Sequence, residues 1–179
     1  MNRLFPGLSL WAAAGLFAVP AVAQPATPVA SAPSQTDAKA VERATALSGI
    51  METLSRYCFA VGEREPKMLP STFTPGGRIV AEVAHGKPVK PMNSPAEIVD
   101  FIMKGRQQQG DVRRHFITNF WIEKLEGNQA TVHSYHVIIV SPPGRSETRS
   151  TGLYRDEMVR GEDGIWLTRV KQVTLDAPY

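Results

Sequence analysis

The sequence predicts an α+β fold, in which helices come first and a meander of long antiparallel strands follows. In two stretches between about residues 37 and 104, apolar residues recur at spacings of three and four, which is typical of amphipathic helices. From about residue 114, apolar and polar residues alternate in long runs separated by turns, which is typical of strands. Helices grouped before strands indicate an α+β order. We therefore expect a curved, mainly antiparallel sheet wrapped around the first helix and enclosing a cone-shaped cavity.

Residues 1–23 have the layout of a secretory signal peptide. Arg3 carries the only early charge, and an apolar run extends from Leu8 to Val19. Small residues at 21 and 23 then form a cleavage site before Gln24. Because the apolar run is too short to span a membrane as a helix, an uncleaved anchor is the weaker alternative. We expect an exported protein, periplasmic or secreted, with no membrane association after signal cleavage.

Residues 24–36 are uncharged and rich in Pro, Ala, Thr and Ser, so we expect a linker there and a single folded domain over 37–179. The domain opens with a helix of about 25 residues, which Thr36 or Asp37 can cap and Gly62 can end. One apolar stripe makes this helix amphipathic. The stripe consists of Leu47, Ile50, Met51, Leu54, Tyr57, Cys58 and Val61.

Shorter elements connect this helix to the strands. Residues 65–73 are predicted as a short helical turn, and residues 78–83 as a short strand. Ser94 begins a capping box followed by a proline, which predicts a second helix running to about residue 104. We expect this helix to bury three apolar side chains, those of Ile98, Phe101 and Ile102.

Four long strands are predicted over 114–125, 129–140, 148–160 and 165–175. The first of them carries the main polar candidates, His115 and Asn119. Side chains of a regular strand alternate between its two faces. One face should therefore carry His115, Ile117, Asn119 and Trp121, and the other Phe116, Thr118, Phe120 and Ile122. We expect His115 and Asn119 to look inward at the enclosed cavity.

Composition and spacing argue against several classes of function. Cys58 is the only cysteine, so the chain can form neither an intramolecular disulfide nor a cysteine metal cluster. His133 and His136 are three positions apart on a strand and point to opposite faces, so we expect no metal site. Acids and bases are interspersed at a net formal charge of +3, which predicts no nucleic-acid surface. The sequence has no phosphate-binding loop or dinucleotide fingerprint, so no cofactor is expected.

Several short motifs occur in a particular order between about residues 45 and 176. They are the helix face of Ile50, Leu54 and Tyr57, then Phe73-Thr74-Pro75-x-Gly77, His85-Gly86-Lys87, Arg114-His115-x-x-Thr118-Asn119, Ser134-Tyr135, Gly152-x-Tyr154-x-Asp156, Asp163-Gly164-x-Trp166, Arg169 and Asp176. In order and spacing they resemble the SnoaL-like family of the nuclear transport factor 2-like superfamily, which is similar to the scytalone dehydratase and steroid isomerase relatives.

The resemblance implies a cone-shaped α+β barrel with a ligand cavity, and a homodimer packed through the outer face of the sheet. It implies that His115 is the catalytic acid or base, with Tyr57 and Asn119 as polar orienting groups. Tyr135 or Tyr154 would then be a phenol donor. The chain departs from the family at 61–63, where Val, Gly and Glu stand in place of the aspartate that many relatives carry a few residues after the helix tyrosine.

Three functions remain open from the sequence. The first is a cofactor-independent dehydratase, isomerase or cyclase acting on a small apolar cyclic molecule. The second is a periplasmic protein that binds such a molecule without turning it over, and the third is a dimerisation module. The candidate catalytic residue is His115, and Asp156 is expected to pair with Arg169. The candidate ligand-binding residues are Tyr57, Asn119, Trp121, Tyr135 and Tyr154.

Overall fold

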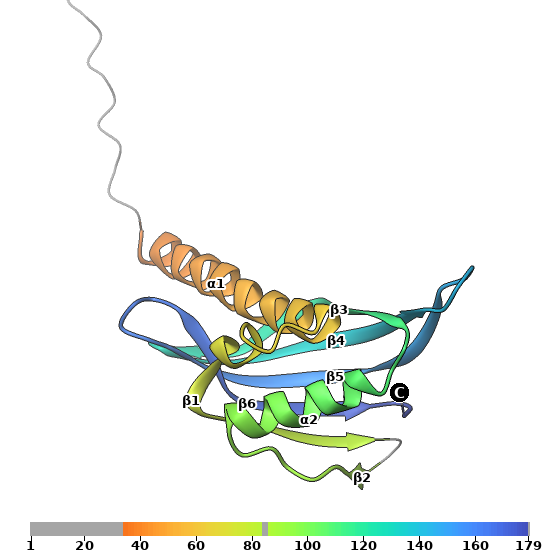
Figure 1. Cartoon of the computed structure of the whole chain (residues 1–179). Coiled ribbons are helices and arrows are strands. Elements are labelled where there is room, and N and C mark those ends of the chain that lie inside the picture. The colour runs from red at the N-terminus through yellow and green to blue at the C-terminus, as the bar shows by residue number, and fades with distance from the viewer. Residues whose placement is uncertain (1–33, 84–85, 179) are drawn as a thin grey trace, which may run out of the picture. The chain divides into compact units, whose positions relative to one another are not determined.

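The structure, a computed structural model, describes residues 34–83 and 86–178 (Figure 1). Its elements are the helix α1 (Gln35–Glu63), a 3-10 helix η1 (Leu69–Thr72), the strands β1 (Phe73–Val83) and β2 (Lys87–Pro88), the helix α2 (Pro95–Gln107), and the strands β3 (Val112–Glu126), β4 (Gln129–Ser141), β5 (Glu147–Arg160) and β6 (Trp166–Leu175). The predicted signal peptide over 1–23, most of the predicted linker and His85 lie outside the described residues.

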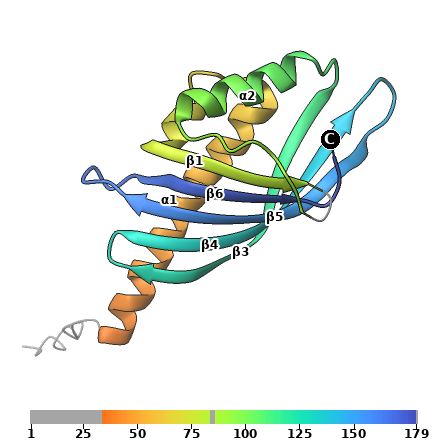
Figure 2. The same ribbon diagram turned by 90° about the horizontal axis from the view of Figure 1, so that it is seen from below.

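The six strands form one curved sheet in the order β2-β1-β6-β5-β4-β3 (Figure 2). Neighbouring strands are antiparallel except β1 and β6, which run parallel. This arrangement confirms the predicted α+β class and the mainly antiparallel sheet. The sheet does not close on itself, because β2 and β3 are its two edges. The predicted cone is therefore built by an open sheet rather than by a closed barrel.

The helix α1 is the long amphipathic helix that the sequence predicts, but both of its ends differ from the prediction. It begins inside the predicted linker, because Ser34 and Asp37 form a capping box. It continues past Gly62 and ends where Arg64 adopts a left-handed conformation with a φ of 62°. Gly62 instead permits close packing on β3, since a Cβ there would lie 3.1 Å from the carbonyl oxygen of Arg113.

Both helices and the inner face of the sheet share one buried core. Its members include Tyr57, Cys58 and Val61 of α1, Ile98 of α2, and Ile79, Ile138, Tyr154 and Val173 of the strands. The prediction that Phe101 is buried was wrong, because its side chain remains 49% exposed. Within the part of the chain that the structure describes, no helix has the length and apolar character needed to cross a membrane.

A bulge in β3 changes which side chains face inward. The pairing of β3 with β4 shifts between Thr118 and Trp121, and Asn119 between them has a positive φ of 55°. After the extra residue, Ile122 is buried and Trp121 is 54% exposed, which reverses the alternation. The prediction that one face carries His115, Asn119 and Trp121 together was therefore wrong.

Candidate functional site

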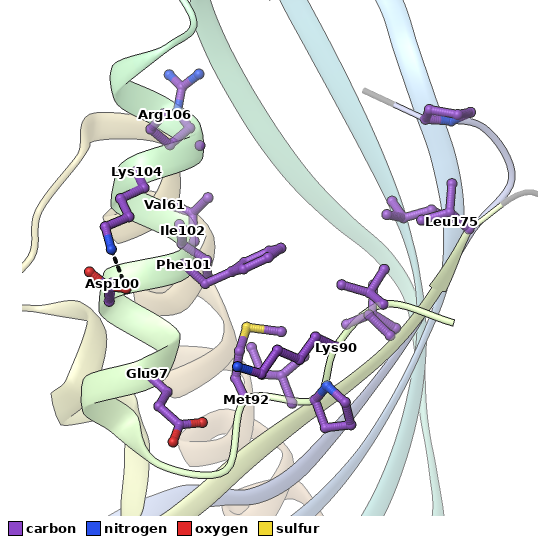
Figure 3. A pocket seen from close by; sticks show the side chains of 18 of the residues that line it. Val61, Lys90, Met92, Glu97, Asp100, Phe101, Ile102, Lys104, Arg106 and Leu175 are labelled. Carbon is purple, nitrogen blue, oxygen red and sulfur yellow. Dashed lines mark hydrogen bonds and ion pairs between the residues drawn. The ribbon is translucent and has the colours of Figure 1, made fainter. Parts of the chain in front are cut away.

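A pocket of about 650 Å³ lies between α2 and the β1–β6 part of the sheet (Figure 3). Its walls are mainly apolar. They are lined by Ile79, Ala81 and Val83 of β1, Val173 and Leu175 of β6, Phe101 and Ile102 of α2, Val61 of α1, and the segment 89–92 that follows β2. Figure 3 shows the ring of Phe101 projecting from α2 into this hollow, which explains why its predicted burial fails.

Charged side chains gather where the pocket meets solvent. Lys90, Glu97, Asp100 and Lys104 contribute to its lining. Lys104 and Asp100 form an exposed ion pair of 2.8 Å along one face of α2. Glu97 accepts a hydrogen bond from the backbone of Asn93 at 2.8 Å and so also fixes the start of α2. The pocket thus combines an apolar interior with a charged rim, the composition expected of a site for a small molecule.

Two tyrosines, Tyr57 of α1 and Tyr154 of β5, form the floor of the pocket. Both side chains are buried, and their rings meet edge to face with centroids 6.3 Å apart. Tyr57 lies on the apolar stripe of its helix, and Tyr154 lies on the inward-facing side of its strand. Of the five predicted ligand-binding residues, these are the two that line the pocket.

Behind the tyrosines lies a fully buried ion pair. Lys171 Nζ is 2.9 Å from Asp156 Oδ1 and 3.0 Å from Asp156 Oδ2, and both side chains are 0% exposed. Burial is the main cause that raises the pKa of Asp156, and the neighbouring ammonium opposes it. The predicted pairing of Asp156 with Arg169 was wrong, because Arg169 lies on the other face of β6 and contacts Glu157 at 3.1 Å.

His136 packs against Tyr154 without lining the pocket itself, and the sequence analysis did not select it. Its ring stacks on Tyr154 with centroids 4.2 Å apart and 14° between the planes. Its Nε2 lies 3.2 Å from the carbonyl oxygen of Thr174, which requires that this nitrogen donates. Burial lowers the pKa of His136, so the ring is held neutral. The sequence predicts that His133 and His136 point to opposite faces of the sheet, so one of the two had to face inward. This was the signal that could have identified His136.

His115 occupies a different place from the one predicted. It faces inward, but it lines a separate hollow of about 240 Å³ between α1 and β3, together with Cys58 and Phe59. Burial, followed by the nearby charge of Arg106, lowers the pKa of His115 to about 3. A neutral imidazole outside the large pocket is poorly placed to move a proton of a ligand bound there.

Asn119, Trp121 and Tyr135 do not line the pocket either. Trp121 and Tyr135 lie on the outer face of the sheet and are 54% and 56% exposed. Trp121 stacks on His133 with centroids 4.8 Å apart, and His133 contacts Glu123 at 2.9 Å. The side chain of Asn119 lies at the exposed bulge, where its oxygen accepts a hydrogen bond from Thr118. These positions correct the expectation of an inward-facing group.

The residues 34–83 and 86–178 contain no group of three His, Cys, Asp or Glu side chains that could hold a metal ion.

Helices laid along an open, curved sheet around a pocket define the class of nuclear transport factor 2-like α+β cones. The model of the SnoaL-like domain matches residues 42–171, so the chain belongs to the SnoaL-like family. No curated protein matches the chain.

Solved structures share this fold at low sequence identity. ActVI-ORFA from Streptomyces coelicolor is 20% identical with a TM-score of 0.64, over 73% of this chain and 97% of that one. A protein from Catenulispora acidiphila in complex with S-DNPA is 23% identical with a TM-score of 0.64, over 74% and 95%. An NTF2-like protein from Novosphingobium aromaticivorans is 18% identical with a TM-score of 0.62, over 79% and 90%. These likenesses show the fold.

Proposed function

We propose that this chain is an exported SnoaL-like protein that binds a small apolar molecule in the pocket between α2 and the sheet. The observation that carries the proposal is the pocket itself, whose volume of about 650 Å³ and apolar walls suit a molecule of a few fused rings. Export rests on the signal-like residues 1–23. The solved relative in complex with S-DNPA supports the idea that this fold holds small molecules.

The polar groups of the pocket support binding over a purely structural role. Tyr57 and Tyr154 both contribute phenol side chains to a cavity whose walls are mainly apolar and whose rim is charged. A few convergent polar groups in an apolar cavity orient a ligand, because each can hydrogen-bond one ligand atom while the walls exclude water. A ligand with an apolar body and one oxygen fits this distribution.

The test of binding uses a matched pair of substitutions on β1. Ala81 lines the pocket, whereas its neighbour Val80 points to the opposite face and is 42% exposed. Ala81→Phe should fill the cavity and weaken binding of methoxynaphthalene, measured by equilibrium dialysis, by at least about tenfold, or about 1.4 kcal/mol. Val80→Phe adds the same ring outside the cavity and should leave binding unchanged. Equal binding by both variants would refute the proposed site.

A second candidate function is cofactor-independent acid–base catalysis of the isomerase or lyase type at the same floor. The observation that favours it is that a buried ammonium and an imidazole pack against the Tyr154 ring and fix its orientation at the pocket. A phenol held in place can act as a hydrogen-bond donor to a ligand carbonyl. The protein should then accelerate exchange of the α-deuterium of an enolisable fused-ring ketone, with Tyr154 hydrogen-bonding the enolate oxygen while solvent water accepts the deuteron and returns a proton. Tyr154→Phe should abolish the acceleration, and exchange no faster than in buffer would eliminate this candidate.

We also propose that two copies of the chain pair through the outer face of the sheet. Trp121, Tyr135 and Leu153 are exposed there on adjacent strands, and aromatic side chains of this kind are enriched at protein interfaces. Sedimentation should show a dimer at micromolar concentration, and Tyr135→Arg should yield a monomer that retains pocket binding. A wild-type monomer would contradict this pairing.

A further inference from the structure

Phe101 and Gly105 lie one turn apart on the face of α2 that looks into the pocket. Residues four apart share one face of a helix, and both of these residues line the pocket. Figure 3 shows the ring of Phe101 projecting into the hollow. The side chain of Phe101 is 49% exposed, whereas Ile98, on the face of α2 that meets the core, is fully buried. Phe101 therefore offers apolar surface to a molecule that occupies the pocket.

Gly105 is a glycine that the fold of α2 does not require. It lies inside the helix, two residues before the end at Gln107, and its φ is not positive. A Cβ built at this position would meet nothing within 4 Å, so no neighbouring element demands a missing side chain. Glycine is among the least favourable residues inside a helix. What the glycine provides is open space in front of the backbone, on the side of the pocket.

Both ends of α2 are fixed to the rest of the molecule. At its start, Ser94 caps the helix through a hydrogen bond of 3.2 Å. Near its end, the buried side chain of Arg106 donates a hydrogen bond to the carbonyl oxygen of Gly62 in α1 at 3.4 Å. The ring of Phe101 and the backbone at Gly105 are thus held in place before a ligand arrives, which reduces the entropy that binding costs.

A bare helix backbone beside an aromatic ring favours a flat ligand. Dispersion attraction is strongest when carbon atoms lie about 3.5–4 Å apart, and a planar ring can bring all the atoms of one face to that distance. A saturated, puckered ring holds some of its atoms further away. Aromatic rings also attract an aromatic side chain beyond the area that they bury, in offset-stacked or edge-to-face contacts. The surface formed by Phe101 and Gly105 therefore discriminates between ligands by ring shape.

We propose that Phe101 and Gly105 are specificity-determining residues, and that a ring of the ligand packs against the backbone of α2 at Gly105, beside the ring of Phe101. The pocket then prefers a planar ring system to a saturated one of the same skeleton. Apolar transfer alone predicts no such preference, because the saturated skeleton has at least as much apolar surface. This inference rests on the proposed binding function and adds to it the part of α2 on which the ligand lies.

The experiment compares methoxynaphthalene with methoxydecalin, which have the same skeleton. In equilibrium dialysis, the wild-type protein should bind the planar probe about fivefold more tightly, which corresponds to one aromatic pair. Phe101→Leu keeps an apolar side chain but removes the ring. In this variant the preference should fall to about twofold or less, because the aromatic contact is lost.

A matched pair of leucine substitutions tests the role of Gly105. Gly105→Leu fills the open space at the pocket wall and should weaken binding of methoxynaphthalene by at least about tenfold. Ala96→Leu adds the same side chain at an exposed position of α2 outside the pocket lining and should leave binding unchanged. The melting temperature of Gly105→Leu should be no lower than that of the wild type, because leucine is a better helix former than glycine.

The outcomes separate this inference from the function on which it rests. If neither probe binds the wild-type protein, the proposed binding function falls and this inference falls with it. If Ala81→Phe weakens binding but Gly105→Leu does not, the pocket stands and the placement of the ligand on α2 is overturned. Equal binding of the two probes by the wild type overturns the selection by ring shape. An unchanged preference in Phe101→Leu also overturns it, and this test holds even where Gly105→Leu fails to fold.

Discussion

Replacing Lys171, in the middle of the interior strand β6, by Met should strongly destabilise the protein. The substitution leaves Asp156 in place, 0% exposed, after removing the group that contacts both of its carboxylate oxygens at 2.9 and 3.0 Å. Breaking a buried pair by removing one partner costs about 3–5 kcal/mol, because the remaining charge is uncompensated. We expect a loss of that size in the free energy of unfolding.

Two companion variants set the scale of this effect. Adding Asp156→Leu to Lys171→Met removes both charges and should recover most of the loss, since an apolar pair is often as stable as a buried ionic one. Arg169→Met breaks a 3.1 Å contact with Glu157 on the same strand, but that arginine is 51% exposed. Its cost should be no more than about 1 kcal/mol.

Urea unfolding followed by circular dichroism gives the free energies, provided that the slope with denaturant stays constant across the variants. The reasoning is refuted if Lys171→Met lowers the free energy of unfolding by less than about 1 kcal/mol, because a buried carboxylate without its partner destabilises a protein by more than that. It is equally refuted if the double variant is as unstable as the single one, because the two charges would then not be coupled.

Four further predictions follow from single features. The pKa of His115 is lowered from 6.5 to about 3, so between these pH values the unfolded chain binds a proton that the folded chain does not. The free energy of unfolding should therefore fall by about 1.4 kcal/mol per unit as the pH drops from 6.5 towards 3. In acid titrations, His115→Gln should lack this contribution to the pH dependence of stability. Gly152→Ala should strongly lower the melting temperature, because a Cβ at this position would overlap a carbonyl oxygen of β6 and the ring of His136. In the control variant Gly76→Ala, the added Cβ meets no atom within 4 Å, so the melting temperature should stay unchanged. Equal melting temperatures of the two variants would contradict this packing. Burial raises the pKa of Cys58 to about 12, so a thiol reagent should label it in urea but not in the native state at neutral pH, and fast native labelling would count against the buried placement. The intact mass of the exported protein should equal that of a chain that begins at Gln24. A mass that includes residues 1–23 would contradict signal cleavage.

The parts of the site that lie on regular elements could be predicted from the sequence. The apolar stripe of α1 places Tyr57 on its buried face, because helical periodicity repeats without interruption there. The alternation of β5 likewise puts Tyr154 and Asp156 on one side of the sheet. The opposite directions of His133 and His136 follow from the same rule and are observed, one exposed to the outer aromatic face and one stacked on the pocket floor.

The rest of the site depended on features that a local pattern does not contain. The bulge at Asn119 adds one residue to β3. The apolar residues from Ile117 to Ile122 are consistent both with a regular strand and with a bulged strand whose alternation reverses, so the sequence does not decide between them. A lysine on a strand ordinarily faces solvent, so the sequence alone does not predict that Lys171 is buried. Its burial depends on the register of β5 and β6, which sets it opposite Asp156. The parallel pairing of β1 with β6 is also a long-range choice.

A crystal structure of the protein soaked with methoxynaphthalene tests the central claim most directly. We expect electron density for the fused rings between α2 and the β1–β6 part of the sheet, against Phe101 and beside Tyr57 and Tyr154. Density only in the small hollow at His115, or only on the outer face around Trp121, would contradict a binding site in the large pocket.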